Sequence, residues 1–101
     1  MFASVTSVRG GGPDVAETAR MAAESMLTWL RQFDGYEGLL ILADPETGTA
    51  RIASFWESKE AADRSAFGRT QVREKMVASA GVELERVELL EVVLTDGLAG
   101  S

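Results

Sequence analysis

The sequence contains no cysteine, no histidine and no asparagine. Without cysteine there are no disulfides, thiolate metal sites or thiol nucleophiles. Without histidine there is no imidazole base, no Ser-His-Asp triad and no histidine ligand, so we expect no metal site. A chain free of cysteine also suits a reducing compartment, and we expect a cytoplasmic protein.

Basic residues and long hydrophobic runs are also scarce. The chain has 10 Lys and Arg against 16 Asp and Glu, a net charge of -6. An acidic domain without a basic stripe repels phosphate backbones. No stretch approaches the roughly 18 apolar residues of a membrane helix, and residues 1–5 show no signal-peptide pattern. We therefore expect neither nucleic acid nor a membrane as a partner.

The composition itself is that of a globular protein. Of the 101 residues, 46% are hydrophobic and 26% are charged, a balance that suits one folded domain. We expect a single domain over residues 1–95, followed by a short flexible C-terminal tail at 96–101.

Alternating and β-branched residues predict four strands. These strands cover residues 2–8, 36–43, 49–56 and 83–95. The second and third are separated by a short turn that contains Pro45 and Gly48, so they form a hairpin.

Two helices are predicted between these strands. The first begins at Asp14, which forms a capping-box pattern with Glu17, and it runs to about residue 32. Ser58 caps the second helix, Gly68 interrupts it, and Gly81 ends it after a further stretch from about residue 70 to 80.

The resulting order, βαββαβ, predicts a ferredoxin-like α+β fold with both helices on one face of a four-stranded antiparallel sheet. Several strands are apolar on both faces, for example at residues 39–42 and 92–94. Because two helices cover only one face, we expect a second copy to cover the other. The predicted assembly is a homodimer through the sheet faces, a dimeric α/β barrel. The alternatives are a different strand register and a different partner protein.

Two short sequence segments resemble those of a known family. Residues 33–39 (FDGYEGL) and 55–61 (FWESKEA) resemble the second-strand entry and the Trp-ended third strand of the antibiotic biosynthesis monooxygenase-like family. The match runs over nearly the whole chain. It implies the same dimer and one pocket per subunit between sheet and helices. Some members oxidise polycyclic aromatic compounds with molecular oxygen and no cofactor, some degrade haem, and others have no known activity.

This sequence departs from the catalytic members of that family. The resemblance implies that haem degraders carry a histidine ligand where Ser65 stands, and an asparagine on the first strand, and both are missing here. Members that oxidise aromatic compounds typically use Asn, Trp, Tyr and Arg, of which only Trp56 occupies a matching position. We therefore expect no haem degradation and no cofactor.

Trp56 is the main candidate for the pocket, because an indole can stack on an aromatic ligand and donate one hydrogen bond. Ser54 shares its strand face, whereas Tyr36 and Arg51 are expected on the opposite parity. Each candidate has ordinary packing as its alternative role. The remaining pocket candidates are Trp29, Thr6, Met26 and Phe67, with Ser4 beside Thr6 on the first strand.

Two functions follow from these observations. The first is a pocket-bearing dimer that binds an apolar or aromatic small molecule and acts on it as a cofactor-independent monooxygenase. The alternative is a non-catalytic dimeric α/β-barrel protein that binds a ligand or another protein. The sequence identifies no catalytic residue, because it specifies no acid–base constellation.

Overall fold

A computed structural model of the chain describes residues 1–98, without the side chains at positions 67, 72, 75, 76, 79 and 80. The pocket candidate Phe67 and the end of the predicted tail at 99–101 lie outside the described part. The elements, in chain order, are β1 (Phe2–Arg9), the short 3-10 turn η1 (Gly12–Asp14), α1 (Val15–Leu30), β2 (Tyr36–Asp44), β3 (Thr49–Trp56), α2 (Lys59–Ala80) and β4 (Glu83–Glu91).

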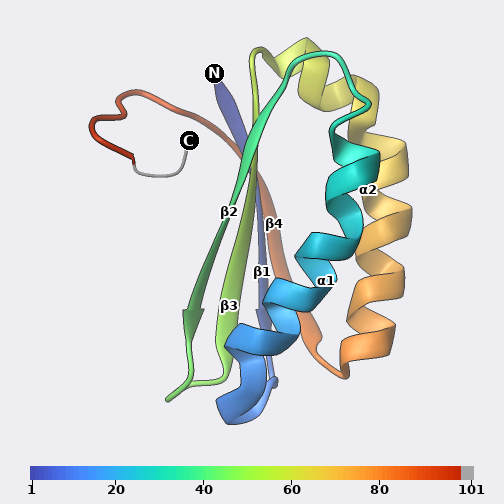
Figure 1. Ribbon diagram of the computed structural model, residues 1–101, viewed down its shortest axis with the longest axis vertical. Helices are drawn as coiled ribbons and strands as arrows, with labels where there is room; N and C mark the ends of the chain where they lie inside the picture. The colour runs from blue at the N-terminus through green and yellow to red at the C-terminus, as the bar shows by residue number, and fades with distance from the viewer. Residues whose placement is uncertain (99–101) are drawn as a thin grey trace.

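The four strands form one antiparallel sheet in the order β2-β3-β1-β4, and α1 and α2 lie side by side on one face of it (Figure 1). This arrangement confirms the ferredoxin-like α+β fold predicted from the order of elements. Within the described residues, no helix has both the length and the apolar character needed to cross a membrane.

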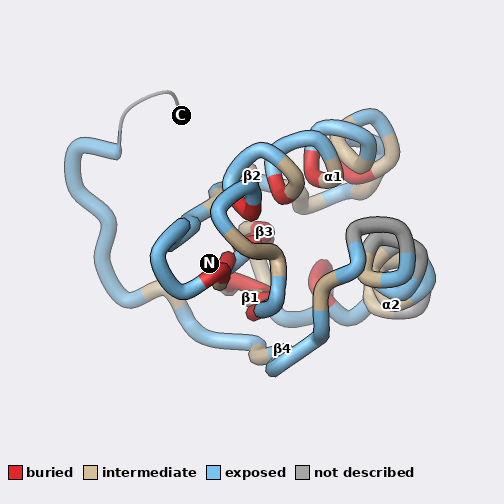
Figure 2. The backbone as a smooth tube through the Cα atoms, turned by 90° about the horizontal axis from the view of Figure 1, so that it is seen from below, coloured by how far each residue is buried: buried red, intermediate tan, exposed pale blue. Residues whose placement is uncertain are grey.

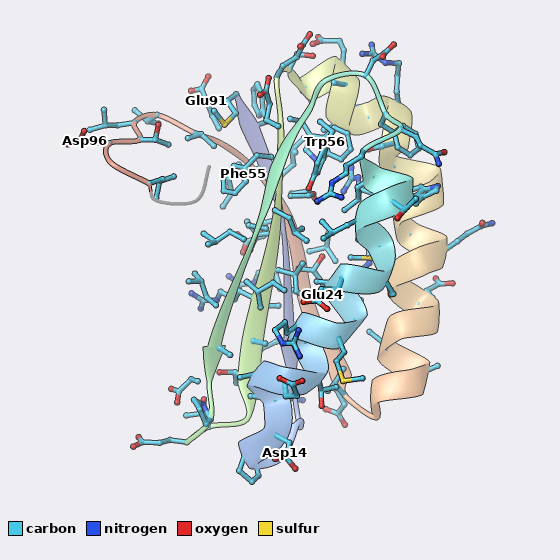
Figure 3. All side chains as sticks on the ribbon, viewed as in Figure 1. Asp14, Glu24, Phe55, Trp56, Glu91 and Asp96 are labelled. Carbon is cyan, nitrogen blue, oxygen red and sulfur yellow. The ribbon has the colours of Figure 1, made fainter. Side chains whose placement is uncertain are left out.

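Successive residues of β3 point to opposite faces of the sheet, as the strand period requires. Trp56 points toward the helices and is completely buried, whereas Phe55 points to the far side of the sheet (Figure 3). Antiparallel pairing places Phe2 and Ser4 of β1 on the helix side, opposite Trp56 and Ser54. The helix side of the two central strands therefore carries the candidate pocket residues.

The core lies between the two central strands and the inner side of the helices. One buried cluster joins Val8, Val15, Ala19 and Ala50, and another joins Leu30, Trp56, Ala61 and Ala62. By contrast, β4 and the chain beyond it are largely exposed (Figure 2). The helices cover β1 and β3 well, and they leave the edge strand β4 open to solvent.

The last strand is shorter than predicted. It ends at Glu91 instead of residue 95, although the chain stays apolar through Leu94. Its neighbour β1 supplies the reason, because β1 begins at Phe2 and the amide of Val92 already donates to the Met1 carbonyl at 2.8 Å. Beyond that bond the described chain offers no strand to pair with, and hydrophobic sequence alone does not extend a sheet.

Three helix ends were predicted from capping residues, and all three lie at those residues, with the expected capping geometry at two of them. The Ser58 hydroxyl accepts a hydrogen bond from the Ala61 amide at 3.1 Å, and Gly81 ends α2 in the left-handed conformation with φ +67°. The capping box at Asp14 is wrong, since its side chain makes no capping bond. The turn η1 leads into α1 instead, and Glu17 pairs with Arg20.

The predicted interruption of the second helix at Gly68 is also wrong, because α2 is continuous from Lys59 to Ala80. A Cβ atom at Gly68 would lie 2.4 Å from Cζ2 of Trp29, far closer than van der Waals contact. The glycine therefore serves a close approach between the Trp29 ring and the backbone of α2, and it does not break the helix.

Candidate ligand pocket

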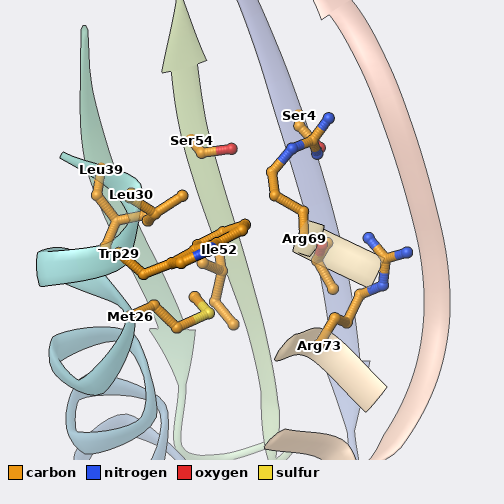
Figure 4. A pocket seen from close by; sticks show the side chains of 10 residues that line it. Ser4, Met26, Trp29, Leu30, Leu39, Ile52, Ser54, Arg69 and Arg73 are labelled. Atoms are coloured by element: carbon orange, nitrogen blue, oxygen red, sulfur yellow. The ribbon is translucent and has the colours of Figure 1, made fainter. Parts of the chain in front are cut away.

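A pocket lies between the helices and the helix-facing side of the sheet (Figure 4). Its empty space is about 410 Å³ when the open mouth is included, and about 30 Å³ of it can hold the centre of a water molecule. The latter corresponds to room for about two waters. An aromatic ligand is larger than two waters, so it enters only if side chains that line the pocket move or if it extends into the open mouth.

The two sides of the pocket differ in chemistry (Figure 4). One wall, which we call the apolar wall, is formed by side chains of α1, β2 and β3, namely Met26, Trp29, Leu30, Leu39 and Ile52. The opposite wall, the polar wall, is formed by β1, β3 and α2, with Ser4, Thr6, Ser54, Arg69 and Arg73. No carboxylate lines the pocket among the described side chains.

Trp56 lies beside this pocket and does not line it. Its ring is fully buried, and its Nε1 donates to the Ser54 hydroxyl at 3.0 Å. The rings of Phe33 and Tyr36 meet it edge to face, with centroids 6.2 and 5.7 Å away. The single N–H donor of the indole is therefore used by Ser54, and this bond fixes the orientation of a hydroxyl that lines the pocket.

The contact of Tyr36 with Trp56 shows that Tyr36 lies on the helix side of the sheet, contrary to the prediction. Tyr36 was expected on the other face of the sheet, but the pairing of β2 with β3 shifts register between Tyr36 and Gly38. This bulge turns the tyrosine to the helix side, where burial raises the pKa of its phenol. Arg51, in contrast, is exposed and pairs across the sheet with Leu42, away from the pocket.

The guanidinium of Arg69 is held by three neutral oxygens. Its Nε donates to the Ser65 hydroxyl at 2.7 Å, its Nη1 to the Ser4 hydroxyl at 2.5 Å, and its Nη2 to the Ala62 carbonyl at 2.8 Å. It also lies 5.4 Å from the centroid of the Trp56 ring, a cation–π distance. The side chain is thus rigidly placed, with no counter-charge among its hydrogen-bond partners.

Burial and a neighbouring positive charge both act on Arg69. Burial lowers the pKa of its guanidinium, the charge of Arg73 lowers it further, and Asp63 acts weakly in the opposite direction. Arg73 itself donates from Nη2 to the Thr70 hydroxyl at 3.1 Å, while its Nε is buried and has no hydrogen-bond partner within the described residues. Neither guanidinium forms an ion pair with any described carboxylate.

The structure brings five of the predicted candidates together at the pocket: Ser4, Thr6, Met26, Trp29 and Ser54. Sequence reasoning missed Arg69 and Arg73. A signal was present, since Arg69 falls four residues after Ser65, the position that the resemblance assigns to a haem ligand, and therefore on the same side of a continuous helix. The supposed break at Gly68 hid this spacing.

Two further observations concern cofactors. Ser65, at the position that the resemblance assigns to a haem-ligating histidine, is fully buried, and its hydroxyl donates to the Ala62 carbonyl at 2.9 Å. In the part of the chain that the structure describes, no three His, Cys, Asp or Glu side chains gather as a metal site would require.

Comparison with known proteins links the fold to solved structures. The sequence matches no protein-family model, and none of the curated proteins matches it. A candidate antibiotic biosynthesis monooxygenase from Deinococcus radiodurans superimposes with a TM-score of 0.69 at 20% identity, covering 99% of this chain and 100% of that one. The monooxygenase ActVA-Orf6 of Streptomyces coelicolor, solved with the ligand nanaomycin D, gives 0.68 at 16% identity over 99% and 92% of the two chains.

A third similar structure is SnoaB, a cofactor-independent oxygenase from Streptomyces nogalater. It superimposes with a TM-score of 0.64 at 15% identity, over 93% of this chain and 92% of that one. At such identities the likeness establishes a shared fold. The chain therefore has the fold of the antibiotic biosynthesis monooxygenase-like structures that its sequence resembles.

Proposed function

We propose that this chain is a homodimer of the antibiotic biosynthesis monooxygenase type, and that its pocket binds a small, largely apolar aromatic molecule. The observation that carries the proposal is the apolar wall, where the Trp29 ring stands beside aliphatic and thioether side chains in an open pocket. Such walls, with a few placed polar groups, are typical of small-molecule sites. The ligand-bound structure of ActVA-Orf6 supports the same use of this fold.

The dimer is supported by apolar side chains that the helices do not cover. Leu40, Leu42 and Leu90 lie on the sheet face opposite the helices and are 39%, 54% and 47% exposed. The chain after β4 turns toward that same side (Figure 1), and its Val93 and Leu94 are more than four-fifths exposed. Monomers rarely leave such a patch in water, and a second copy is its simplest cover.

The reaction we propose is oxygenation without a cofactor, in which the substrate supplies the electrons. A ring CH₂ group of the anthrone type loses two hydrogens and gains one atom of O₂ as a carbonyl oxygen, and the other oxygen atom leaves as water. The description of SnoaB as a cofactor-independent oxygenase supports this chemistry for the fold. In this pocket the apolar wall would hold the ring, and the hydroxyls of Ser54 and Thr6 would orient its oxygen substituents.

The alternative is a non-catalytic binding protein, and one observation favours it. Neither a carboxylate nor an imidazole lines the pocket among the described residues, so no side chain there is suited to accept a proton near neutral pH. A substrate that is not already acidic would find no protein base.

Oxygen consumption separates these functions. The purified protein is mixed with anthrone- and quinol-type compounds in an oxygen electrode, and their binding is measured by quenching of tryptophan fluorescence. We expect saturable binding and substrate-dependent oxygen uptake, with Trp56→Phe lowering the uptake because Ser54 loses its orienting partner. Binding without uptake across the panel establishes the binding protein. If no aromatic compound binds, the proposed function is wrong.

A further inference from the structure

We infer that the pocket selects aromatic compounds that carry an anionic oxygen, a carboxylate or a phenolate, and holds that oxygen at Arg69 and Arg73. The inference rests on the proposed function, since it names the class of ligand that the same pocket takes. We base this inference on the polar wall, because a purely apolar ligand would have no use for two guanidiniums in its pocket.

The first argument is that these two arginines are partly buried and also lack an ion pair. Arg9, Arg20 and Arg86 are paired with glutamates on the surface. The other three arginines of the chain form no ion pair with a described residue but are exposed to water, namely Arg31, Arg51 and Arg64. The chain carries six more acidic than basic residues, so carboxylates are abundant. The two guanidiniums at the pocket nevertheless have no carboxylate partner among the described side chains.

The second argument is electrostatic. A half-buried cation without a counter-ion is costly, and two such cations that repel each other cost more. Burial and Arg73 both disfavour the charged form of Arg69, and only the weak influence of Asp63 opposes them. An anion in the pocket relieves both effects at once, because it replaces lost hydration and screens the two charges from each other.

The third argument concerns free hydrogen-bond donors. Arg73 uses Nη2 on Thr70, and its Nε is buried without a partner. Guanidinium donors match the oxygens of a carboxylate or an aromatic oxyanion, and such charge-assisted bonds are stronger than those to the neutral hydroxyls now present. The unpaired donor is thus what an oxyanion site shows before its ligand is bound.

The final argument is the arrangement of the two walls. Arg69 and Arg73 project from α2 on one side of the pocket, and Trp29 and Met26 project from α1 on the other (Figure 4). A ring on the apolar wall therefore directs a substituent toward the guanidiniums. The limited free space favours single-ring compounds as the first probes.

Matched pairs of probes test the charge requirement. Benzoate and benzamide share one shape and differ in charge, as do 4-nitrophenolate and 4-nitroaniline, and the two pairs distinguish a carboxylate from a phenolate. Isothermal titration with the purified protein measures each dissociation constant. We expect at least one anion to bind about tenfold more tightly than its neutral partner, the factor typical of one hydrogen bond to a charged group.

Three variants assign the effect to the polar wall. Arg73→Gln should weaken binding of the preferred anion about tenfold and leave its neutral partner unchanged. Arg69→Lys, which keeps the charge and loses the forked geometry, should give a smaller loss. The control is Arg64→Gln, because Arg64 is an exposed arginine of the same helix and should change neither constant. Arg73 is the decisive position, since its replacement leaves the hydrogen bonds of Arg69 intact.

Equal affinity for the members of both pairs overturns the inference and leaves the aromatic pocket standing. A preference for the anion that persists in the folded Arg73→Gln and Arg69→Lys variants overturns it as well, because the charge would then be recognised elsewhere. If no member of either pair binds, and larger aromatic compounds also fail, the proposed function falls together with this inference.

Discussion

The indole nitrogen of Trp56 donates to the hydroxyl of Ser54 at 3.0 Å, and both residues are buried on the same face of β3. They are two positions apart, so the strand itself sets their spacing. Ser54 also lines the pocket, whereas Trp56 does not. The tryptophan predicted to stack on a ligand is thus a positioning residue in this structure, and the serine is the group that meets the pocket.

Ser54→Ala should destabilise the fold. The substitution leaves the buried indole N–H without an acceptor, which costs about 1–3 kcal/mol of the free energy of unfolding. Urea denaturation followed by tryptophan fluorescence measures it. In a Trp56→Phe background the same change should cost less than about 0.5 kcal/mol, since the donor is gone. Equal costs in both backgrounds would show that this hydrogen bond does not stabilise the protein.

Gly68→Ala should also destabilise the protein, although alanine is the better helix former by about 1 kcal/mol. The added methyl group would lie 2.4 Å from the Trp29 ring and would force the ring into the pocket or the helices apart. We expect a net loss of about 1–3 kcal/mol in urea denaturation. With Trp29→Ala already in place, Gly68→Ala should instead raise stability. A stabilising effect in the wild-type background would contradict the close approach.

The proposed dimer predicts a specific sensitivity of the outer sheet face. Combined Leu40→Lys and Leu42→Lys substitutions bring two charges onto the face opposite the helices and should yield monomers in analytical ultracentrifugation. The matched control is Met21→Lys, which replaces a side chain that is 61% exposed on α1, and it should leave the dimer intact. A wild-type chain that sediments as a monomer at high concentration would remove the dimer from the proposal.

Ser58 offers a test of α2, the helix that carries Arg69 and Arg73. Ser58→Ala removes the acceptor of the Ala61 amide and should cost about 1 kcal/mol of unfolding free energy. Ser58→Asp, which keeps an acceptor and adds a favourable charge at the start of α2, should retain stability. Thermal denaturation followed by circular dichroism measures both. An unchanged midpoint for Ser58→Ala would mean that solvent satisfies the amide equally well.

The fold could be predicted from sequence because its signals are local. Each signal depends on residues only a few positions apart. Examples are the alternation of the strands, the turn at Pro45 and Gly48, and the caps at Ser58 and Gly81. No local signal marks the end of β4, because the strand ends where its partner β1 begins. The sequence stays hydrophobic through Leu94, but β4 ends at Glu91 because β1 extends no further.

The pocket was predicted less completely, for two physical reasons. Tyr36 faces the helix side because one residue is inserted in the β2–β3 register. This bulge was not predicted, although Gly38, a glycine inside the strand, is a typical sign of one. Arg69 was overlooked because Gly68 was interpreted as a helix break, when it accommodates an aromatic ring from another element. In both cases a contact between distant segments decided the outcome.

The division of the pocket into an apolar wall and a polar wall has an evolutionary consequence. The positive charge comes from α2 alone, while the surface that fits a ring comes from α1 and the strands. Two substitutions on α2 would therefore remove both positive charges from the pocket and leave the apolar wall unchanged. In a scaffold of this kind, the charge of the pocket can evolve through one helix while the apolar surface stays the same.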